Sequence, residues 1–214
     1  MGAIMLRYIH ANDLHMFPVL RDSMFRDRAD QFHCRLGWDM QVDAKGWEQD
    51  DYDALNPLYV IWEGAGGRHA GSMRFLPTTG RSMVNDHFLH LTEGVTIRSP
   101  FIWECTRFCL APQADSRVAA GLMLAGGELM RAFHLSHFVG VYDARMVRIY
   151  RMIGAVPDVL GSQGVGRDQI SVGLWTYSHA DRARVLLRAG ISSAASEAWF
   201  DRSFGPILAL QMSA

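Results

Sequence analysis

A scattered set of charged and aromatic side chains in the first half of the chain has the residue types that ligand binding and proton transfer require. Its members, in chain order, are Arg28, Phe32, Trp38, Asp50, Asp53, Arg74, Phe88, Glu104 and Arg107. Aromatic rings can offer their faces to a flat ring or to a cation. The two aspartates could balance the positive charge of such a ligand, and an arginine could hold an anionic or polar group.

The same residue types also have purely structural interpretations. Arg28 and Phe32 are four positions apart and would share one face of a helix, so Phe32, like Trp38, could simply pack in the core. Asp50 and Asp53 could form a solvated turn, and Arg28 could anchor either aspartate instead of a ligand. The residue types alone leave both interpretations open.

Glu104 and Arg107 lie three positions apart in the run WECTRF, whose aromatic content is typical of a strand. In a regular strand their side chains would point to opposite faces. Either the two residues do different jobs, or a β-bulge turns one of them. Together with Arg74 they could also form an ion-pair network that ties strands together, and such a network could serve as the wall of a cleft.

The composition restricts the class of protein. The 214 residues are 49% hydrophobic and carry a formal net charge of -1, so no overall positive field attracts the chain to nucleic acid. No apolar run is long enough to span a bilayer, and the start lacks the apolar region of a signal peptide. Three sparse cysteines argue against a disulfide framework and a zinc site, which is typical of the reducing cytoplasm. We therefore expect a cytoplasmic protein with no metal site and no nucleic-acid or membrane partner.

Hydrophobic periodicity and turn residues predict the elements that must position these side chains. An apolar stripe predicts a helix over residues 12–36 with a break near Pro18, followed by a loop over 39–57. Predicted strands cover 58–63, 69–76, 101–110, 137–142 and 169–177, and predicted helices cover 116–135, 144–154 and 179–190. Gly126 and Gly127 weaken the first of these three helices internally. The order favours a mixed α/β sheet covered by helices on both faces, in one domain spanning residues 1–214.

The scattered set, in this order and at closely similar spacing, resembles the motif of the autoinducer synthases, the acyl-homoserine-lactone synthase family. That motif has an Arg, a Phe and a Trp near the amino terminus and then an acidic pair three residues apart. It continues with an Arg in an S-x-R-x-x-P-T segment, a Phe, and a Glu followed three residues later by an Arg. The Trp38-to-Asp50 gap is about one residue longer than usual and the Phe88-to-Glu104 gap about one shorter, which loops tolerate. The resemblance covers roughly residues 10–180.

The resemblance implies a fold and a reaction. The fold would be a mixed, splayed sheet flanked by helices, the α-β-α sandwich of the GCN5-type N-acyltransferases. The α-amine of S-adenosylmethionine would attack the thioester of an acyl-carrier protein or of acyl-coenzyme A. The methionine carboxylate would then close a lactone and expel methylthioadenosine. S-adenosylmethionine is a substrate in this reaction, so no cofactor is implied.

The resemblance also implies residue roles. Catalysis would depend on Glu104, Arg107 and Arg74, with Glu104 as the base that deprotonates the amine. The binding site for S-adenosylmethionine would be formed by Arg28, Phe32, Trp38, Asp50, Asp53 and Phe88.

The acyl chain requires an apolar tunnel, which the second half of the chain is expected to supply. The candidates for its wall are Met123, Phe138, Val141 and Tyr142, and a bulky Tyr142 would shorten or reshape the tunnel. In the family that the chain resembles, members that prefer 3-oxo acyl chains often carry a Thr or Ser near the end of this strand, where its hydroxyl can hydrogen-bond the keto oxygen, but residues 138–144 include neither. Because a buried polar group without a partner is unfavourable, we expect a preference for donors that lack the 3-oxo group.

A basic strip is predicted on the helix over residues 144–154. Arg145, Arg148 and Arg151 are spaced by three positions and therefore stay close to one helix face. Such a strip could steer an acidic carrier protein. An ordinary solvated helix face is the alternative.

Two other functions stay open at this point. A general N-acyltransferase would use acyl-coenzyme A and a different amine, and such enzymes usually have a Q/R-x-x-G-x-G/A loop around the pyrophosphate. The corresponding residues 112–121 lack this loop, which favours a carrier-protein donor. A non-catalytic sensor of S-adenosylmethionine is the second alternative, and the presence of both Glu104 and Arg107 weighs against it.

Overall fold

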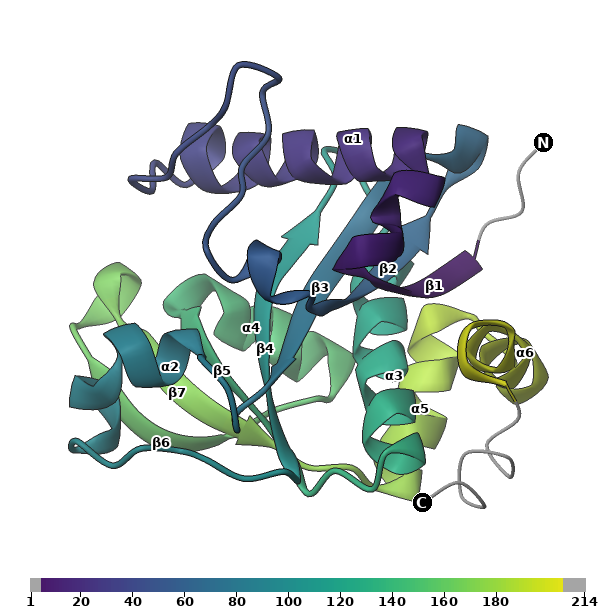
Figure 1. Cartoon of the computed structure of the whole chain (residues 1–214). Helices are drawn as coiled ribbons and strands as arrows, with labels where there is room; N and C mark the ends of the chain where they lie inside the picture. Colours follow the sequence, from purple (N-terminus) through teal and green to yellow (C-terminus); the bar gives the residue numbers. More distant parts are fainter. Residues whose placement is uncertain (1–4, 206–214) are drawn as a thin grey trace.

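The computed structural model describes residues 5–205, and in this part of the chain seven strands form one sheet (Figure 1). The strand order is β1-β2-β3-β4-β5-β7-β6, in which β4 and β5 are parallel and all other neighbours are antiparallel. The strands are β1 (Met5–His10), β2 (Leu58–Glu63), β3 (His69–Pro77), β4 (Ile102–Leu110), β5 (His137–Asp143), β6 (Asp158–Gln163) and β7 (Ile170–Trp175). The predicted mixed sheet is confirmed, although the described chain begins with a strand and not with a helix.

Helices lie on both sides of this sheet. They are α1 (Pro18–Arg28), α2 (Met83–His87), α3 (Ser116–Ala132), α4 (Ala144–Ile153), α5 (His179–Ala189) and α6 (Ser193–Phe204). Pro18 is the first residue of α1, where its missing N–H is tolerated, so the predicted break lies at the start of the helix. At its other end α1 continues into a π-helical segment, Ala29–Arg35, which carries Phe32.

Side chains that alternate along β2 separate the two faces of the sheet. Tyr59 and Ile61 pack with α1 on one face, which we call the α1 face. Val60 and Trp62 pack with residues of α3 on the other, the α3 face. Helices α3, α5 and α6 cover the α3 face, while α1 crosses the strands on the opposite side (Figure 1). The predicted cover of helices on both faces is therefore confirmed.

A bulge interrupts the pairing of β4 with β3. Two residues of β4, Arg107 and Phe108, lie opposite the single residue Met73 of β3. Arg107 has a φ of +52°, which is outside the range of regular strands. Of the two possibilities that the sequence left open, the structure has the bulge, and Arg107 points to the α1 face together with Glu104.

Strands β4 and β5 separate soon after they meet. They pair only between Ile102–Glu104 of β4 and His137–Val139 of β5, although both strands continue beyond these residues. Parallel neighbours that diverge leave part of their backbone without a partner strand. The cavity described below lies at this divergence.

Four elements were not predicted from the sequence, namely β1, β6, α2 and α6. The side chains of β6 are mostly exposed, so they show no apolar alternation. Helix α6 packs on β1, where the ring centroids of Phe200 and Tyr8 are 5.1 Å apart. That contact joins segments almost a whole chain apart, which local patterns do not report. In the described residues, no helix has both the length and the apolar character needed to cross a membrane.

Candidate active site

Six charged side chains form a closed ring on the α1 face, which we call the charge ring. Each carboxylate in it bridges two guanidinium groups. Asp53 bridges Arg28 and Arg74, Asp50 bridges Arg74 and Arg107, and Glu48 bridges Arg107 and Arg28. The six N–O distances lie between 2.5 and 3.1 Å. Three positive and three negative charges therefore balance inside the ring.

Long-range contacts build the ring from α1, β3, the β4 bulge and the loop over 39–57. Arg28 donates two hydrogen bonds of 2.9 Å to the two oxygens of Asp53, the planar geometry that guanidinium and carboxylate groups favour. The Tyr59 hydroxyl also donates to Asp53. Arg74 donates from Nε to the Thr106 hydroxyl at 2.9 Å, which connects the ring to β4.

Burial and pairing oppose each other in setting the pKa values of the ring. Burial alone would raise the pKa of Asp53, but the guanidinium groups of Arg28 and Arg74 lower it well below its usual value. Burial would likewise raise the pKa of Asp50, but Arg74 and Arg107 together have the larger effect and lower it. Desolvation would lower the pKa of Arg28, yet Asp53 and Glu48 raise it. These aspartates are therefore ionised near neutral pH and are poor proton acceptors.

The ring contains five of the residues predicted from the sequence, namely Arg28, Asp50, Asp53, Arg74 and Arg107. It corresponds to the interpretation in which Arg28 anchors an aspartate. Sequence reasoning missed the sixth member, Glu48, which is fully buried. Glu48 opens the run EQDDYD and lies two positions before Asp50, so an extended backbone would place both carboxylates on one side. That spacing was the available signal.

An aromatic pair lies next to the ring. Phe32 and Trp38 stack with ring centroids 5.2 Å apart and an angle of 11° between their planes. Phe32 is buried and lies under the Arg107 guanidinium at 5.5 Å, whereas Trp38 is 41% exposed. An exposed aromatic ring beside a set of fixed charges is a suitable platform for a flat or cationic ligand. Phe88 lies elsewhere, against the apolar cluster of Val84 and Val139 beneath α2.

Glu104 is the buried carboxyl of this region that lies outside the ring. Its Oε2 accepts the Met83 N–H at 2.9 Å and its Oε1 accepts the Val84 N–H at 2.6 Å. Glu104 thus caps the start of α2 from a neighbouring strand, in place of the cap position Ser82. Burial raises the pKa of Glu104 and outweighs the two N–H groups, which lower it.

Met83 joins Glu104 to the charge ring. Its backbone N–H binds Glu104, and its sulfur lies 3.5 Å from Arg74 Nη2 and 3.6 Å from Arg107 Nη1. The three residues predicted to act in catalysis therefore converge on one methionine. The sequence held no signal for Met83, because its position depends on where α2 starts.

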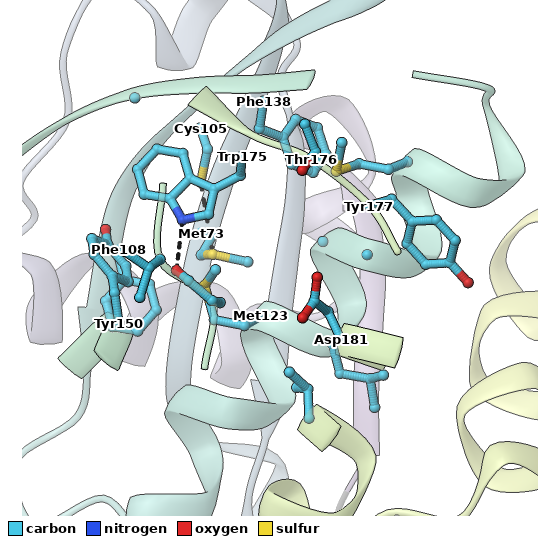
Figure 2. Close-up of a pocket in the computed structure, with 18 of the residues that line it drawn as sticks. Met73, Cys105, Phe108, Met123, Phe138, Tyr150, Trp175, Thr176, Tyr177 and Asp181 are labelled. Carbon is cyan, nitrogen blue, oxygen red and sulfur yellow. Dashed lines mark hydrogen bonds between the residues drawn. The ribbon is translucent and has the colours of Figure 1, made fainter. Parts of the chain in front are cut away.

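A cavity of about 380 Å³ opens on the other side of the diverging strands (Figure 2). Apolar and aromatic side chains make up most of its wall, among them Met73, Cys105, Met123, Phe138, Tyr150 and Trp175. The indole N–H of Trp175 donates to the Ala155 carbonyl at 2.9 Å, which fixes this ring in the wall. Thr106 and Arg107 line the same cavity, so it meets the charge ring at the β4 bulge.

The structure changes part of the predicted tunnel. Met123, Phe138 and Val141 line the cavity, although the Val141 side chain also packs against the cluster beneath α2. Tyr142 is not among the lining residues and packs edge-on against Tyr150 and Trp175, 5.3 and 5.7 Å away. Tyr142 therefore does not belong to the wall of this cavity, because the rings of Tyr150 and Trp175, which line it, cover Tyr142.

Helix α4 carries the predicted basic strip on its solvent side. Arg145, Arg148 and Arg151 are all exposed. The Asp143 side chain caps the helix and lies 3.6 Å from the Arg145 guanidinium. Arg148 and Arg151 lie further along the same helix, whose Tyr150 reaches into the cavity wall.

Comparison with known proteins gives this geometry a context. A family model described as autoinducer synthase matches residues 14–185. An acyl-homoserine-lactone synthase of Rhizobium etli is 41% identical over 196 residues, which cover 88% of this chain and 91% of that protein. Two solved structures share the fold. One is a coenzyme A-dependent acyl-homoserine lactone synthase, BjaI, solved with S-adenosylmethionine and isopentyl-coenzyme A, with a TM-score of 0.77, 22% identity, and coverage of 89% and 92%. The other is an acyl-coenzyme A N-acyltransferase of Pseudomonas aeruginosa, with a TM-score of 0.54, 13% identity, and coverage of 79% and 98%.

Proposed function

The chain belongs to the autoinducer synthase family, and from that membership we propose how its charge ring, Glu104 and cavity divide the work of the reaction. The protein is an acyl-homoserine-lactone synthase. It joins the α-amine of S-adenosylmethionine to an acyl group delivered as a thioester by acyl-carrier protein or coenzyme A, and lactonisation releases methylthioadenosine. The fold is that of the GCN5-type N-acyltransferases.

Glu104 is the general base of this proposal. A free α-amine has a pKa of about 7.7–8.0, so at neutral pH most of it is protonated and cannot attack a thioester. One observation carries the assignment: Glu104 is buried with a raised pKa and accepts its hydrogen bonds from two backbone N–H groups, whereas Asp50 and Asp53 are held ionised by guanidinium groups that bind them directly. A carboxylate that accepts two N–H groups still has free lone pairs, so Glu104 can take the proton directly or through water.

Trp38 and Arg107 are the proposed contacts of S-adenosylmethionine. Trp38 offers its exposed ring to the adenine or the sulfonium, and Phe32 supports it from behind. Arg107 lines both the ring and the cavity, so it can orient the methionine carboxylate towards the reacting carbonyl. Arg28, Arg74, Asp50 and Asp53 would act mainly by positioning Arg107, because they belong to the ring but do not line the cavity. Phe88 lies among apolar side chains, so its part would be to support α2.

The cavity on the α3 face is the proposed site of the acyl chain. Its mostly apolar lining suits a hydrocarbon, and the part of the cavity lined by Thr106 and Arg107 lies beside the charge ring. Backbone N–H groups of the diverging strands would stabilise the oxyanion that forms when the amine attacks the thioester. The exposed strip of α4 supports an acidic carrier protein as donor, and the donor of the related BjaI structure supports coenzyme A. One sheet running through the described residues supports a single domain over residues 1–214.

We also place this reaction in the cytoplasm. The three cysteines are free, as is typical of proteins in a reducing compartment.

Substitution of the proposed base tests this assignment. Glu104→Gln should lower kcat about 10²- to 10⁴-fold, the usual contribution of a general base, while the KM for S-adenosylmethionine changes little. Product analysis by mass spectrometry with S-adenosylmethionine and a panel of acyl donors measures it, with circular dichroism to show that the variant folds. Turnover close to that of the unsubstituted enzyme at neutral pH would rule Glu104 out. The same panel separates the synthase from a general N-acyltransferase and from a sensor that forms no product.

A further inference from the structure

Two adjacent glycines lie inside the longest helix that the structure describes. Gly126 and Gly127 belong to α3, which runs from Ser116 to Ala132. Glycine in a helix interior is unfavourable because the unfolded chain has more backbone freedom to lose. Neither residue has the positive φ that would require glycine. Their presence therefore needs an explanation from the surroundings of the helix.

Both glycines line the cavity, and both leave space there. A Cβ on Gly126 would lie 3.5 Å from the Phe138 ring and 3.8 Å from Met73 and Phe75, and a Cβ on Gly127 would lie 3.7 Å from the Tyr177 ring. These are ordinary van der Waals distances, so a methyl group would fit without moving its neighbours. Close packing of the protein does not explain these glycines.

A third glycine of the same helix shows the contrast. A Cβ on Gly121 would lie 2.1 Å from the Trp62 ring, so that glycine is required for the packing of α3 on β2. Gly121 does not line the cavity. Helix α3 thus carries two kinds of glycine: one that a close neighbour requires, and two that lie beside open space.

The space next to Gly127 lies at the end of the cavity away from the reaction, whereas Gly126 lies against Phe138, Met73 and Phe75. Strands β4 and β5 run in the same direction, and Arg107 lies on β4 three residues past Glu104, the last β4 residue that pairs with β5. Strand β7 runs the opposite way. Its Trp175 pairs with Phe138 near the start of β5, and Tyr177 lies two residues past Trp175, beyond the start of β5. Arg107 and Tyr177 therefore mark opposite ends of the cavity, and Gly127 faces Tyr177. In Figure 2, Tyr177 and Asp181 lie together on one side of the cavity, and Phe108 and Tyr150 lie on the other.

We propose that Gly126 and Gly127 determine the longest acyl chain that the enzyme accepts, by keeping the space beside them, up to the Tyr177 end of the cavity, open for an unbranched acyl tail. The proposal rests on the proposed acyl site and deepens it. An acyl tail that passes Phe138 would fill the space next to these two residues, where any larger side chain would stop it. In this proposal, the stability that the two glycines cost α3 is offset by the space that they leave for the substrate.

The Gly126→Ala substitution should change two properties in opposite directions, raising the stability of the protein and lowering its activity with long acyl donors. Gly126→Ala should raise the melting temperature, since alanine favours the helix and meets no clash. The same variant should lower kcat/KM for the longest accepted donor about tenfold, as an added methylene in an apolar pocket does, and leave short donors nearly unchanged. Gly126→Leu should remove turnover of long donors and keep that of short ones. The measurement is a series of unbranched acyl donors that differ by two carbons.

Gly121→Ala is the matched control on the same helix. It should lower the melting temperature through the contact with Trp62 and keep the preference for chain length. Calorimetry with a series of unreactive acyl thioethers measures the affinity of the cavity for each chain length without any reaction taking place. A chain-length preference that stays the same in Gly126→Ala and Gly126→Leu, in turnover and in binding, would overturn the proposal. If the thioethers bind with the expected dependence on length but the thioester donors yield no lactone, the proposed reaction fails and the role of the glycines stands.

Discussion

The two faces of the sheet use buried residues in different ways. On the α1 face, three arginines and three carboxylates close a ring in which every charge has two partners. On the α3 face, a cavity of about 380 Å³ is bounded mostly by apolar side chains, with two glycines that leave space. The β4 bulge, with Thr106 and Arg107, is where the two regions meet.

This difference indicates which property each region controls. A buried charge that loses its partner costs far more than a small change of volume, so the ring tolerates little substitution. A cavity tolerates changes in its volume, and such changes alter which substrates the enzyme accepts. We therefore expect the α1 face to set the chemistry and the orientation of S-adenosylmethionine, and the α3 face to set the range of acyl donors.

The largest effect is expected where the ring is opened. Asp53→Asn should lower the free energy of unfolding by about 3–5 kcal/mol, because Arg28 and Arg74 would each lose a charged partner while buried. Asp51→Asn is the matched control, since Asp51 lies in the same run and is exposed, and it should change stability by less than about 0.5 kcal/mol. Urea denaturation measures both. Equal losses in the two variants would show that the ring is not the stable unit described here.

The pH dependence of the same variant follows from the lowered pKa of Asp53. A carboxyl whose pKa is lower in the folded state stabilises the protein above its unfolded pKa of about 3.9, and this contribution is lost as the pH falls towards the folded value. The difference in stability between the unsubstituted protein and Asp53→Asn should therefore be constant near neutral pH and shrink below about pH 4. A difference that grows on acidification would contradict the assigned ionisation.

The next effect concerns the aromatic pair beside the ring. Trp38→Ala should raise the KM for S-adenosylmethionine up to about tenfold, the range of a stacking contact, with a small change in melting temperature because Trp38 is 41% exposed. Trp47→Ala is the control. Trp47 stacks on Phe25 at 5.3 Å within the α1 packing, so that variant should lose stability and keep its KM. Equal weakening of both substrates by Trp38→Ala, with a lower melting temperature, would restore the interpretation of Trp38 as a packing residue.

A smaller effect is expected outside both regions, on α4. Arg148→Glu should raise the KM for acyl-carrier protein up to about fivefold at low salt, since an exposed ion pair contributes about 1 kcal/mol or less, and the effect should fade as salt screens it. Arg188→Glu on α5, also exposed, is the control for net charge. An unchanged KM at low salt would remove the strip from the carrier interface.

The smallest effect concerns a 3-oxo group on the acyl chain. The lack of Ser and Thr in residues 138–144 favours donors without this group, but Thr106 of β4 and Thr176, which follows β7, are among the residues that line the cavity. Because Thr106 accepts a hydrogen bond from Arg74 and keeps its own proton to donate, we expect a preference for unsubstituted donors of less than about threefold. Competition between donors of equal length measures it, and Thr106→Val should increase it. A clear preference for the 3-oxo donor would show that a wall residue binds the keto oxygen.

Much of this protein could be read from local patterns. Helix α5 was predicted over 179–190 and spans His179–Ala189, and β2 was predicted with its observed bounds, because periodicity and turn residues act over a few positions. The residue types of the site, and the resemblance that they carry, are likewise properties of the chain itself. They were sufficient for the family and the reaction.

The tertiary structure decided what those residues do to one another. Arg107 and Asp50 are 57 positions apart and meet only because a bulge turns Arg107 to the α1 face. The same assembly added Glu48 to the ring, placed Tyr142 behind Tyr150 and Trp175, and gave Gly126 a neighbouring space. A sequence specifies each side chain, but its charge partner and its free volume depend on strands that pair across the whole fold. For that reason the reaction could be predicted from the amino-acid sequence, whereas the closed ring and the shape of the cavity could not.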